Sequence, residues 1–155
     1  MDYKIIGLSP EPFLDLYGLS DAALTERNAK RYRADTRPGF PDRIEIRDVE
    51  PGEDVLLVNF VHQPESTPYR ASHAVFVREG AEEAIAFRNE VPEALKLRPL
   101  SVRAFDAAHW MVDADLCDGL HLENLVRRFL VNENVEYLQV HFAKRGCYAA
   151  RVERT

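Results

Sequence analysis

The sequence predicts an α+β fold: a single domain with a largely antiparallel sheet and two or three helices packed mainly on one side. Two observations lead to this prediction. Segments of strand composition follow one another through the middle and the end of the chain, joined by short turns of the kind that connect antiparallel strands. Helical patterns occur only near the start and before the last pair of strands.

Length and composition are those of an ordinary globular protein. At 155 residues the chain is expected to form one domain over residues 1–155, because folding at this length buries roughly 68–70% of the extended surface. A hydrophobic share of 46% and a charged share of 30% are close to the globular average and do not favour a disordered or fibrous protein. The net charge of −6 argues against nucleic acid and anionic membranes as partners.

A cytoplasmic location is expected. The first residues do not look like a secretory signal, because an acidic residue comes early and no long apolar region follows. The longest apolar run, Val55–Val61, is far shorter than the ~20 residues of a membrane-spanning helix. Two cysteines, Cys117 and Cys147, are too few for a disulfide framework and are expected to remain thiols.

The first 31 residues predict one strand and two helices. Residues 3–8 have strand composition, and Ser9 then caps a short helix that ends at Gly18. A second helix is expected to start at Ser20 or Asp21 and to run to about Arg31, with a thin apolar stripe.

The middle of the chain predicts three strands. Two prolines and a glycine exclude a continuous helix from residues 37–42. Residues 43–47 alternate polar and apolar side chains, as in a half-exposed strand, whereas residues 55–61 are apolar on both faces, as in a central one. Pro51-Gly52 is the turn between them, and residues 73–79 form the next strand.

The last third of the chain predicts two hairpins and one helix. Residues 100–105 and 109–112 are expected to pair across the connection at 106–108. Residues 135–142 and 147–153 are expected to form the final pair, around a turn in which Gly146 takes a positive φ. Between the hairpins, apolar residues at i, i+3, i+4 and i+7 predict a helix packed on the sheet. They are Leu122, Leu125, Val126 and Phe129.

A polar cluster lies where the strand over residues 73–79 begins. Arg70 offers a planar fork for a carboxylate or a phosphate, Ser72 a hydroxyl, and His73 an imidazole that titrates near neutral pH. Tyr69 precedes them. The cluster predicts an anion-binding site. The alternative is that Arg70 pairs with an acidic side chain and His73 hydrogen-bonds within the sheet.

The final hairpin carries the second candidate cluster. Alternation places Tyr137, Gln139 and His141 on one face of their strand and the apolar side chains on the other. Arg145 lies at the turn and Cys147 begins the return strand, so that His141 is a candidate base for a cysteine nucleophile. The alternative is that Cys147 is simply a small buried hydrophobic residue.

No catalytic or cofactor motif of known mechanism is present, and the sequence does not identify a cofactor. Four potential zinc ligands are spaced by four residues: His109, Asp113, Cys117 and His121. No metal site is expected, because residues 109–112 have strand composition and Gly119 interrupts the segment. Basic residues between positions 27 and 47 alternate with acidic ones, as on a solvated face rather than a nucleic-acid interface.

Five segments carry a resemblance to a known family: Arg37–Pro41, Pro51–Glu53, Pro68–Glu79, Arg103–Asp106 and Lys144–Arg151. They resemble the bacterial family known as domain of unknown function 1203, over nearly the whole chain. Its members are single-domain proteins of about this length, so the resemblance implies one domain in the bacterial cytoplasm. It implies no particular activity.

The function expected from the two clusters is the binding of a small anionic molecule in a polar pocket, which requires the strand at His73 and the final hairpin to lie close together. The candidate ligand-binding residues are Arg70, Ser72, His73, His141 and Arg145, with Tyr69, Asn59 and Cys147 as secondary candidates. One alternative is a noncatalytic interaction module, for example a homodimer, whose contact face includes Trp110, Tyr137 or Tyr148. Another is an enzyme that uses His73 or His141 as a general base.

Overall fold

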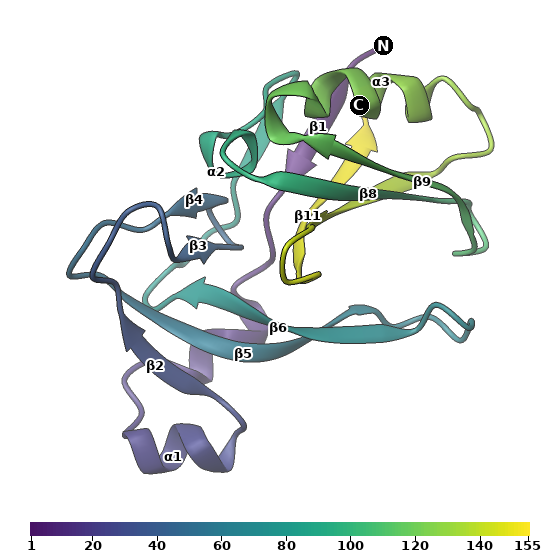
Figure 1. Ribbon diagram of the computed structural model, residues 1–155. Helices are drawn as coiled ribbons and strands as arrows, with labels where there is room; N and C mark the ends of the chain where they lie inside the picture. The colour runs from purple at the N-terminus through teal and green to yellow at the C-terminus, as the bar shows by residue number, and fades with distance from the viewer.

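A computed structural model of residues 1–155 places the strands of the chain in three antiparallel sheets (Figure 1). The largest sheet has six strands in the order β7-β1-β11-β10-β8-β9. Its strands are β1 (Tyr3–Ile6), β7 (Ala86–Arg88), β8 (Pro99–Phe105), β9 (Met111–Asp118), β10 (Tyr137–Phe142) and β11 (Tyr148–Arg154). The predicted α+β class and antiparallel pairing are confirmed.

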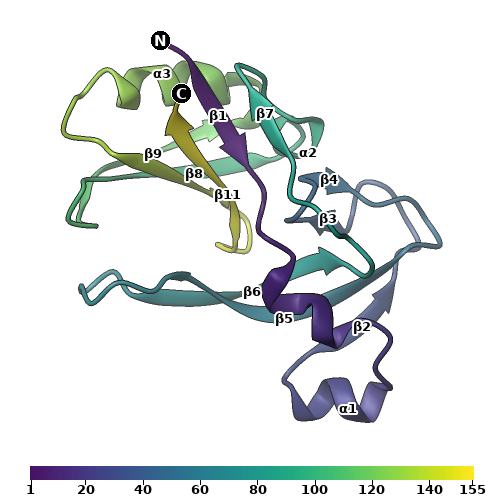
Figure 2. The ribbon, with the colours of Figure 1, turned by 180° about the vertical axis from the view of Figure 1, so that it is seen from behind.

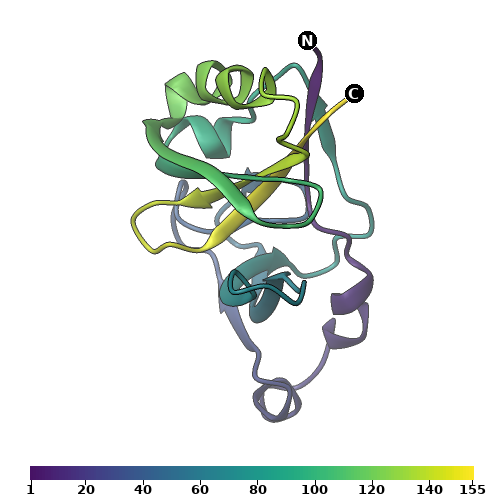
Figure 3. The same cartoon turned by 90° about the vertical axis from the view of Figure 1, so that its right-hand side faces the viewer.

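The second sheet has three strands in the order β2-β5-β6, and the third is a short two-stranded ribbon. The strands are β2 (Lys30–Arg33), β5 (Asp54–Gln63) and β6 (Ala71–Arg78), with β3 (Pro41–Asp42) and β4 (Arg47–Asp48) in the ribbon. Strands β5 and β6 form a long hairpin that runs beneath the six-stranded sheet (Figures 1 and 3).

Five short helices complete the fold. They are the 3₁₀ helices η1 (Glu11–Leu16) and η2 (Gly119–His121) and the α-helices α1 (Asp21–Glu26), α2 (Glu93–Lys96) and α3 (Leu122–Leu130). Helix α3 covers the face of the six-stranded sheet that lies away from the β5–β6 hairpin, whereas η1 and α1 accompany the three-stranded sheet (Figure 2). No helix has both the length and the apolar character needed to cross a membrane.

The larger hydrophobic core lies between α3 and the six-stranded sheet. Strand alternation turns Leu138 and Val140 of β10 toward this side, where they join Leu125, Val126 and Phe129 of α3 in one cluster. Burying a side chain of this size stabilises the fold by about 1.5–3 kcal/mol relative to leaving it exposed. The apolar stripe predicted for this helix is therefore confirmed.

A second core connects the two larger sheets. It contains Leu56 and Val58 of β5 together with Phe13 of η1. Tyr148 of β11 belongs to the same cluster, and its ring centroid lies 5.4 Å from that of Phe60. A residue of the six-stranded sheet is thus part of the core of the three-stranded sheet, so the packing of one sheet sets the position of the other.

The helix predicted to reach Arg31 is shorter than expected. Ser20 caps α1 by accepting a hydrogen bond from the backbone N–H of Ala23 at 3.1 Å, as predicted, but the helix ends at Glu26. Asn28 then takes a left-handed φ of 53°, which turns the chain into β2. Tertiary pairing of β2 with β5 overrides the weak helical pattern of this segment.

The strand predicted over residues 43–47 is wrong, because residues 43–46 are a turn between β3 and β4 and only Arg47 belongs to a strand. The carboxylate of Asp42 accepts hydrogen bonds from the backbone N–H groups of Ile44 and Glu45 at 3.1 and 2.7 Å. Ile46 takes a φ of 52°, which no strand residue has. Side-chain acceptors near the backbone thus replace the ladder bonds of a strand.

Strand β9 begins later and continues further than the predicted strand over residues 109–112. His109 has a φ of 67° and belongs to the turn, whereas residues 111–118 pair with β8. The short elements β7 and α2 were not predicted, since three or four residues carry too little periodicity to be recognised.

Gly119 is required by a close backbone approach. A Cβ atom at this position would lie 2.0 Å from the carbonyl oxygen of Leu95 and 2.7 Å from that of Arg98. Gly119→Ala is therefore expected to lower the free energy of unfolding by about 1–3 kcal/mol, measured by urea denaturation. Gly39→Ala is the control, because its nearest new contact, at 2.9 Å, is the end of the Thr36 side chain. Equal losses in the two variants would contradict this role for Gly119.

Candidate functional site

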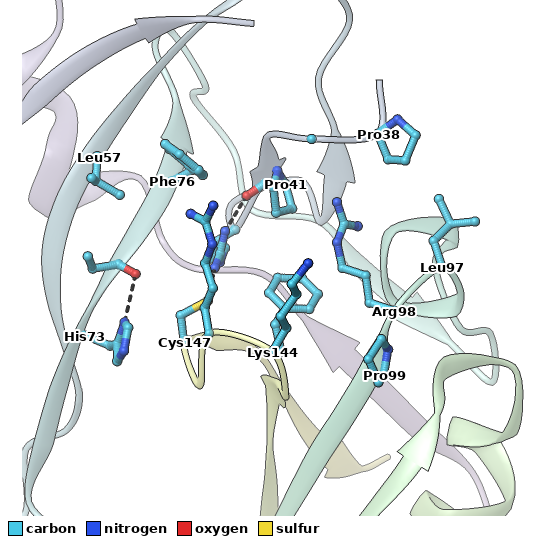
Figure 4. Close-up of a pocket in the computed structure, with 15 residues that line it drawn as sticks. Pro38, Pro41, Leu57, His73, Phe76, Leu97, Arg98, Pro99, Lys144 and Cys147 are labelled. Carbon is cyan, nitrogen blue, oxygen red and sulfur yellow. Dashed lines mark hydrogen bonds between the residues drawn. The ribbon is translucent and has the colours of Figure 1, made fainter. Parts of the chain in front are cut away.

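A cavity of about 530 Å³ opens between the edge strand β6 and the turn that joins β10 to β11 (Figure 4). Its other walls include residues 97–99 together with Pro38, Gly39 and Pro41. The volume lies within the range of roughly 300–1,000 Å³ typical of small-molecule sites. The cavity therefore lies where the final hairpin comes closest to the three-stranded sheet.

The charged side chains that line this cavity are all cationic. They are Arg43, Arg98, Lys144 and Arg145, and no aspartate or glutamate is among the lining residues. The whole chain has a net charge of −6, so positive charge is concentrated here against the overall balance. A concave site lined by one sign of charge raises the local concentration of ions of the opposite sign.

Arg43 is buried in the cavity wall, with only 2% of its surface exposed. Its Nε donates to the carbonyl oxygen of Tyr148 at 2.8 Å and its Nη1 to that of Pro41 at 2.6 Å. Its Nη2 donates to Sγ of Cys147 at 3.0 Å. Burial lowers the pKa of Arg43 to about 10, an effect that Cys147 opposes and Arg98 reinforces. This guanidinium has no carboxylate as a hydrogen-bond partner.

Arg98 lies near the same aromatic ring, that of Phe142, as Arg43, and its charge is neutralised by a carboxylate. Its Nη2 and Nη1 donate to the two carboxylate oxygens of Asp48 at 2.6 and 2.8 Å. The Cζ atoms of Arg43 and Arg98 lie 4.8 and 5.1 Å from the centroid of the Phe142 ring. At these distances both guanidinium groups form favourable cation–π interactions with the ring.

Lys144 and Arg145 stand on the turn between β10 and β11. Gly146 takes a φ of 77°, as predicted, and its N–H donates to the carbonyl oxygen of Phe142 at 2.8 Å to close the turn. Both cationic side chains are exposed and neither forms a salt bridge. Their charges are therefore available to a molecule that enters the cavity.

The wall formed by the three-stranded sheet is mainly apolar. Leu57 and Phe76 lie on this side with His73, facing the turn of the final hairpin (Figure 4). His73 Nδ1 lies 3.2 Å from the carbonyl oxygen of Ala74. The cavity thus has a cationic side and an apolar side.

The cavity brings together three of the eight residues that the sequence singled out: His73, Arg145 and Cys147. The strand at His73 and the final hairpin are therefore neighbours, as the expected pocket requires. Arg70 lies outside this wall, where it is exposed and donates to the carbonyl oxygen of Pro64. It does not pair with an acidic side chain, which was the alternative.

The other predicted residues of the first cluster point elsewhere. Ser72 is exposed and accepts a hydrogen bond from Nδ2 of Asn59 at 3.3 Å. Asn59 lines a separate, more open depression beside α1. The ring of Tyr69 lies edge-on to Phe105 and Trp110, with centroids 6.1 and 5.8 Å away.

His141 is fully buried between the sheets rather than in the cavity wall. Its Nε2 lies 3.1 Å from Oε1 of Gln139, its Nδ1 lies 3.3 Å from the carbonyl oxygen of Gly146, and His62 Nδ1 donates to the same Oε1 at 2.9 Å. Burial, reinforced by Arg103 and His62, lowers the pKa of His141 to about 3. The imidazole is neutral, so its single N–H serves one of the two acceptors at a time.

This placement does not pair His141 with Cys147, and it leaves His141 without access to a substrate. The thiol of Cys147 has Arg43 as its hydrogen-bond partner, and both ring nitrogens of His141 face other groups. A histidine sealed from solvent with a strongly lowered pKa has no substrate within reach. His73 is the candidate histidine that the cavity retains.

The family model of a protein of unknown function (DUF1203) matches residues 39–154. The chain belongs to this family. No curated protein and no solved structure matches it. The DUF1203 region contains every residue that lines the cavity except Pro38. The cavity is therefore built almost entirely from the part of the chain that defines the family.

Three cationic residues of the DUF1203 cavity were not predicted: Arg43, Arg98 and Lys144. Arg43 was assigned to a solvated run of alternating charges, although its apolar neighbours Pro41 and Ile44 are buried. Lys144 is adjacent to the predicted Arg145, and two cations on one tight turn are a usable signal. Arg98 carries no comparable signal in the sequence.

The spacing of potential zinc ligands has no structural counterpart. Asp113 and Cys117 lie on strand β9, His109 in the preceding turn and His121 in η2, so the four residues do not share a helix. No group of three or more histidine, cysteine, aspartate or glutamate side chains is arranged to hold a metal ion.

Of the aromatic residues considered for an interaction surface, Trp110 alone is exposed. Its exposed fraction is 48%, compared with 1% for Tyr137 and 5% for Tyr148. Tyr137 accepts a hydrogen bond from Gln63 at 2.8 Å and is part of the contact between the sheets. The two tyrosines therefore stabilise the fold and are not part of an outer face.

The buried histidines predict a specific acid sensitivity. Burial lowers the pKa of both His141 and His62 in the folded protein, to about 3 for His141. In the unfolded chain a histidine has its ordinary pKa of about 6.5. Their contribution to stability is complete above pH 6.5 and is lost as the pH falls below it. Between pH 7.5 and pH 5, His141 should account for a loss of about 2 kcal/mol in the free energy of unfolding.

His141→Gln should remove most of this loss, measured by urea unfolding followed through Trp110 fluorescence at the two pH values. His121→Gln is the control, since His121 is exposed. The assignment fails when His141→Gln keeps the full pH dependence of the unmodified chain.

Proposed function

We propose that the protein binds a small molecule carrying phosphate or carboxylate groups in the cavity between β6 and the final hairpin. The observation that carries the proposal is the charge of the wall, which contains no acidic residue and four cationic side chains, of which only Arg98 is paired with a carboxylate. Guanidinium forks and ammonium groups are the usual partners of phosphate and carboxylate oxygens.

The state of Arg43 supports this proposal energetically. Charges removed from water cost several kcal/mol unless opposite charge or good hydrogen bonds compensate them. Arg43 has hydrogen bonds but no anionic partner, and the charge of Arg98 opposes its own. An anion in the cavity would offset the desolvation cost of the buried Arg43 charge, so that binding would also stabilise Arg43.

The shape of the cavity adds a second property to the proposed ligand. Leu57 and Phe76 on the sheet side, and Leu97 beside Arg98, offer apolar surface next to the cations. Ligand sites of this kind are lined mostly by apolar groups, with a few polar ones that set orientation. The proposed ligand therefore has an apolar part as well as its anionic group. As the family resemblance implies, we place this function in the bacterial cytoplasm.

The test is a thermal-shift titration with inorganic pyrophosphate and with citrate. A ligand at a hundred times its dissociation constant adds ~2.7 kcal/mol, which raises the midpoint of unfolding by about 5 to 10 °C for a chain of this size. Lys144→Gln combined with Arg145→Gln should weaken binding by about tenfold for each charge removed. Both side chains are exposed, so the variant should keep the fold.

Arg70→Gln is the matched control, because Arg70 is an exposed arginine outside the cavity wall. It should bind the anions as the unmodified chain does. General salt effects on stability would appear equally in all three proteins. Shifts that are equal in the double variant and the unmodified chain, or absent from both, would contradict the proposed site.

A further inference from the structure

Cys147 is a secondary ligand-binding candidate of the sequence, and its surroundings differ from those of a cysteine packed in an apolar core. Its side chain lines the cavity, and its Sγ accepts the hydrogen bond from Nη2 of Arg43 at 3.0 Å. It is 6% exposed, so the cavity is its route to solvent. A cationic side chain therefore lies within hydrogen-bond distance of a sulfur that faces the cavity.

The cavity supplies an independent reason to expect a ligand beside this sulfur. Arg43 is only 2% exposed, forms part of the wall and has no carboxylate among its hydrogen-bond partners. A guanidinium has five N–H donors, and three of them are used by Tyr148, Pro41 and Cys147. A positive charge in this state attracts an anion to the same wall that carries the thiol.

We propose that Cys147 is a nucleophilic thiol that reacts with small anionic electrophiles held by the cations of the cavity. This inference rests on the proposed anion-binding function. The thiol gives its proton to solvent, the thiolate sulfur forms a bond to the electrophilic atom of the bound anion, and the bond to the leaving group breaks. The leaving group departs with the electron pair, so no oxidant or reductant takes part.

Arg43 and the turn residues have separate roles in this step. Arg43 donates directly to the sulfur and stabilises the negative charge that develops there before the attack. Lys144 and Arg145 have no acidic partner and stand on the adjoining turn, where they hold the anionic group of the electrophile. Cys147 is thus the reacting residue, and the two turn residues select for charge.

The chain contains its own contrasting thiol. Cys117 lies on β9 and is partly exposed, and burial together with the charges of Asp118 and Asp115 raises the pKa of its thiol. A cysteine beside carboxylates repels an anionic reagent. The two cysteines of one protein therefore predict opposite charge preferences.

The experiment compares alkylation by iodoacetate, an anion, with alkylation by the neutral iodoacetamide on the full-length folded chain. Both reagents form an S–C bond and release iodide. Mass spectrometry of peptides gives the alkylation rate at each cysteine. The reference is the ratio of the iodoacetate rate to the iodoacetamide rate for 2-mercaptoethanol, a thiol with no charged neighbours. The iodoacetate-to-iodoacetamide rate ratio at Cys147 is expected to exceed that of 2-mercaptoethanol by about tenfold or more, and the ratio at Cys117 is expected to fall below it.

Lys144→Gln combined with Arg145→Gln is expected to bring the ratio at Cys147 close to the reference, because the ratio of the two rates depends on the charge of the reagent and not on the overall reactivity of the thiol. Pyrophosphate is expected to slow iodoacetate at Cys147 and not at Cys117. Circular dichroism of the double variant checks that the fold is retained, so that a lowered ratio reports lost charge rather than lost structure.

The outcomes separate this inference from the proposed function. If pyrophosphate raises the unfolding midpoint but Cys147 resists both reagents, or shows the reference ratio, the nucleophile is overturned and anion binding stands. If Cys147 prefers iodoacetate, and loses this preference in the double variant, the nucleophile is supported even where pyrophosphate and citrate do not bind. A preference that survives in the double variant overturns the assignment of charge selection to the turn.

Discussion

The buried guanidinium of Arg43 is the interaction on which both the cavity and the junction of the sheets depend. It joins β3 to the final hairpin by donating to the carbonyl oxygens of Pro41 and Tyr148 and to Sγ of Cys147. Because a buried cation is costly without compensation, these bonds and the neighbouring Phe142 ring stabilise a charge that has no carboxylate as a hydrogen-bond partner. The contact that closes the fold therefore also leaves positive charge at a cavity wall.

A polar contact also holds the β5–β6 hairpin against the six-stranded sheet. Gln139 accepts from His62 Nδ1 and donates to the carbonyl oxygen of His62, both at 2.9 Å, and Gln63 donates to the hydroxyl of Tyr137. Buried donors and acceptors must meet particular partners, so such a contact sets the relative position of two sheets more narrowly than an apolar one. The width of the adjoining cavity follows from that position, and so does the neutral state of His141.

The cationic character of the cavity in an acidic protein follows from where the nearby carboxylates are held. Asp48 is paired with Arg98, and Asp42 accepts from three backbone N–H groups, those of Ile44, Glu45 and Arg78. Neither aspartate lines the cavity. Their hydrogen bonds shape the turn after β3 and leave Arg43, Lys144 and Arg145 without acidic partners. Anion binding and the reactivity inferred for Cys147 are two consequences of this one distribution of charge.

Local patterns in the sequence determined the class of the fold, the stripe of α3, the central strand β5 and the hairpin turn at Gly146, because periodicity and turn chemistry act over a few neighbouring residues. They also identified His73, Arg145 and Cys147 as residues of interest. Only the tertiary structure decided that Arg43 and Arg98 join them, that His141 is sealed between the sheets, and that residues 43–46 form a turn. These outcomes depend on contacts between segments up to 105 residues apart, such as Arg43 with Tyr148, which no local pattern encodes.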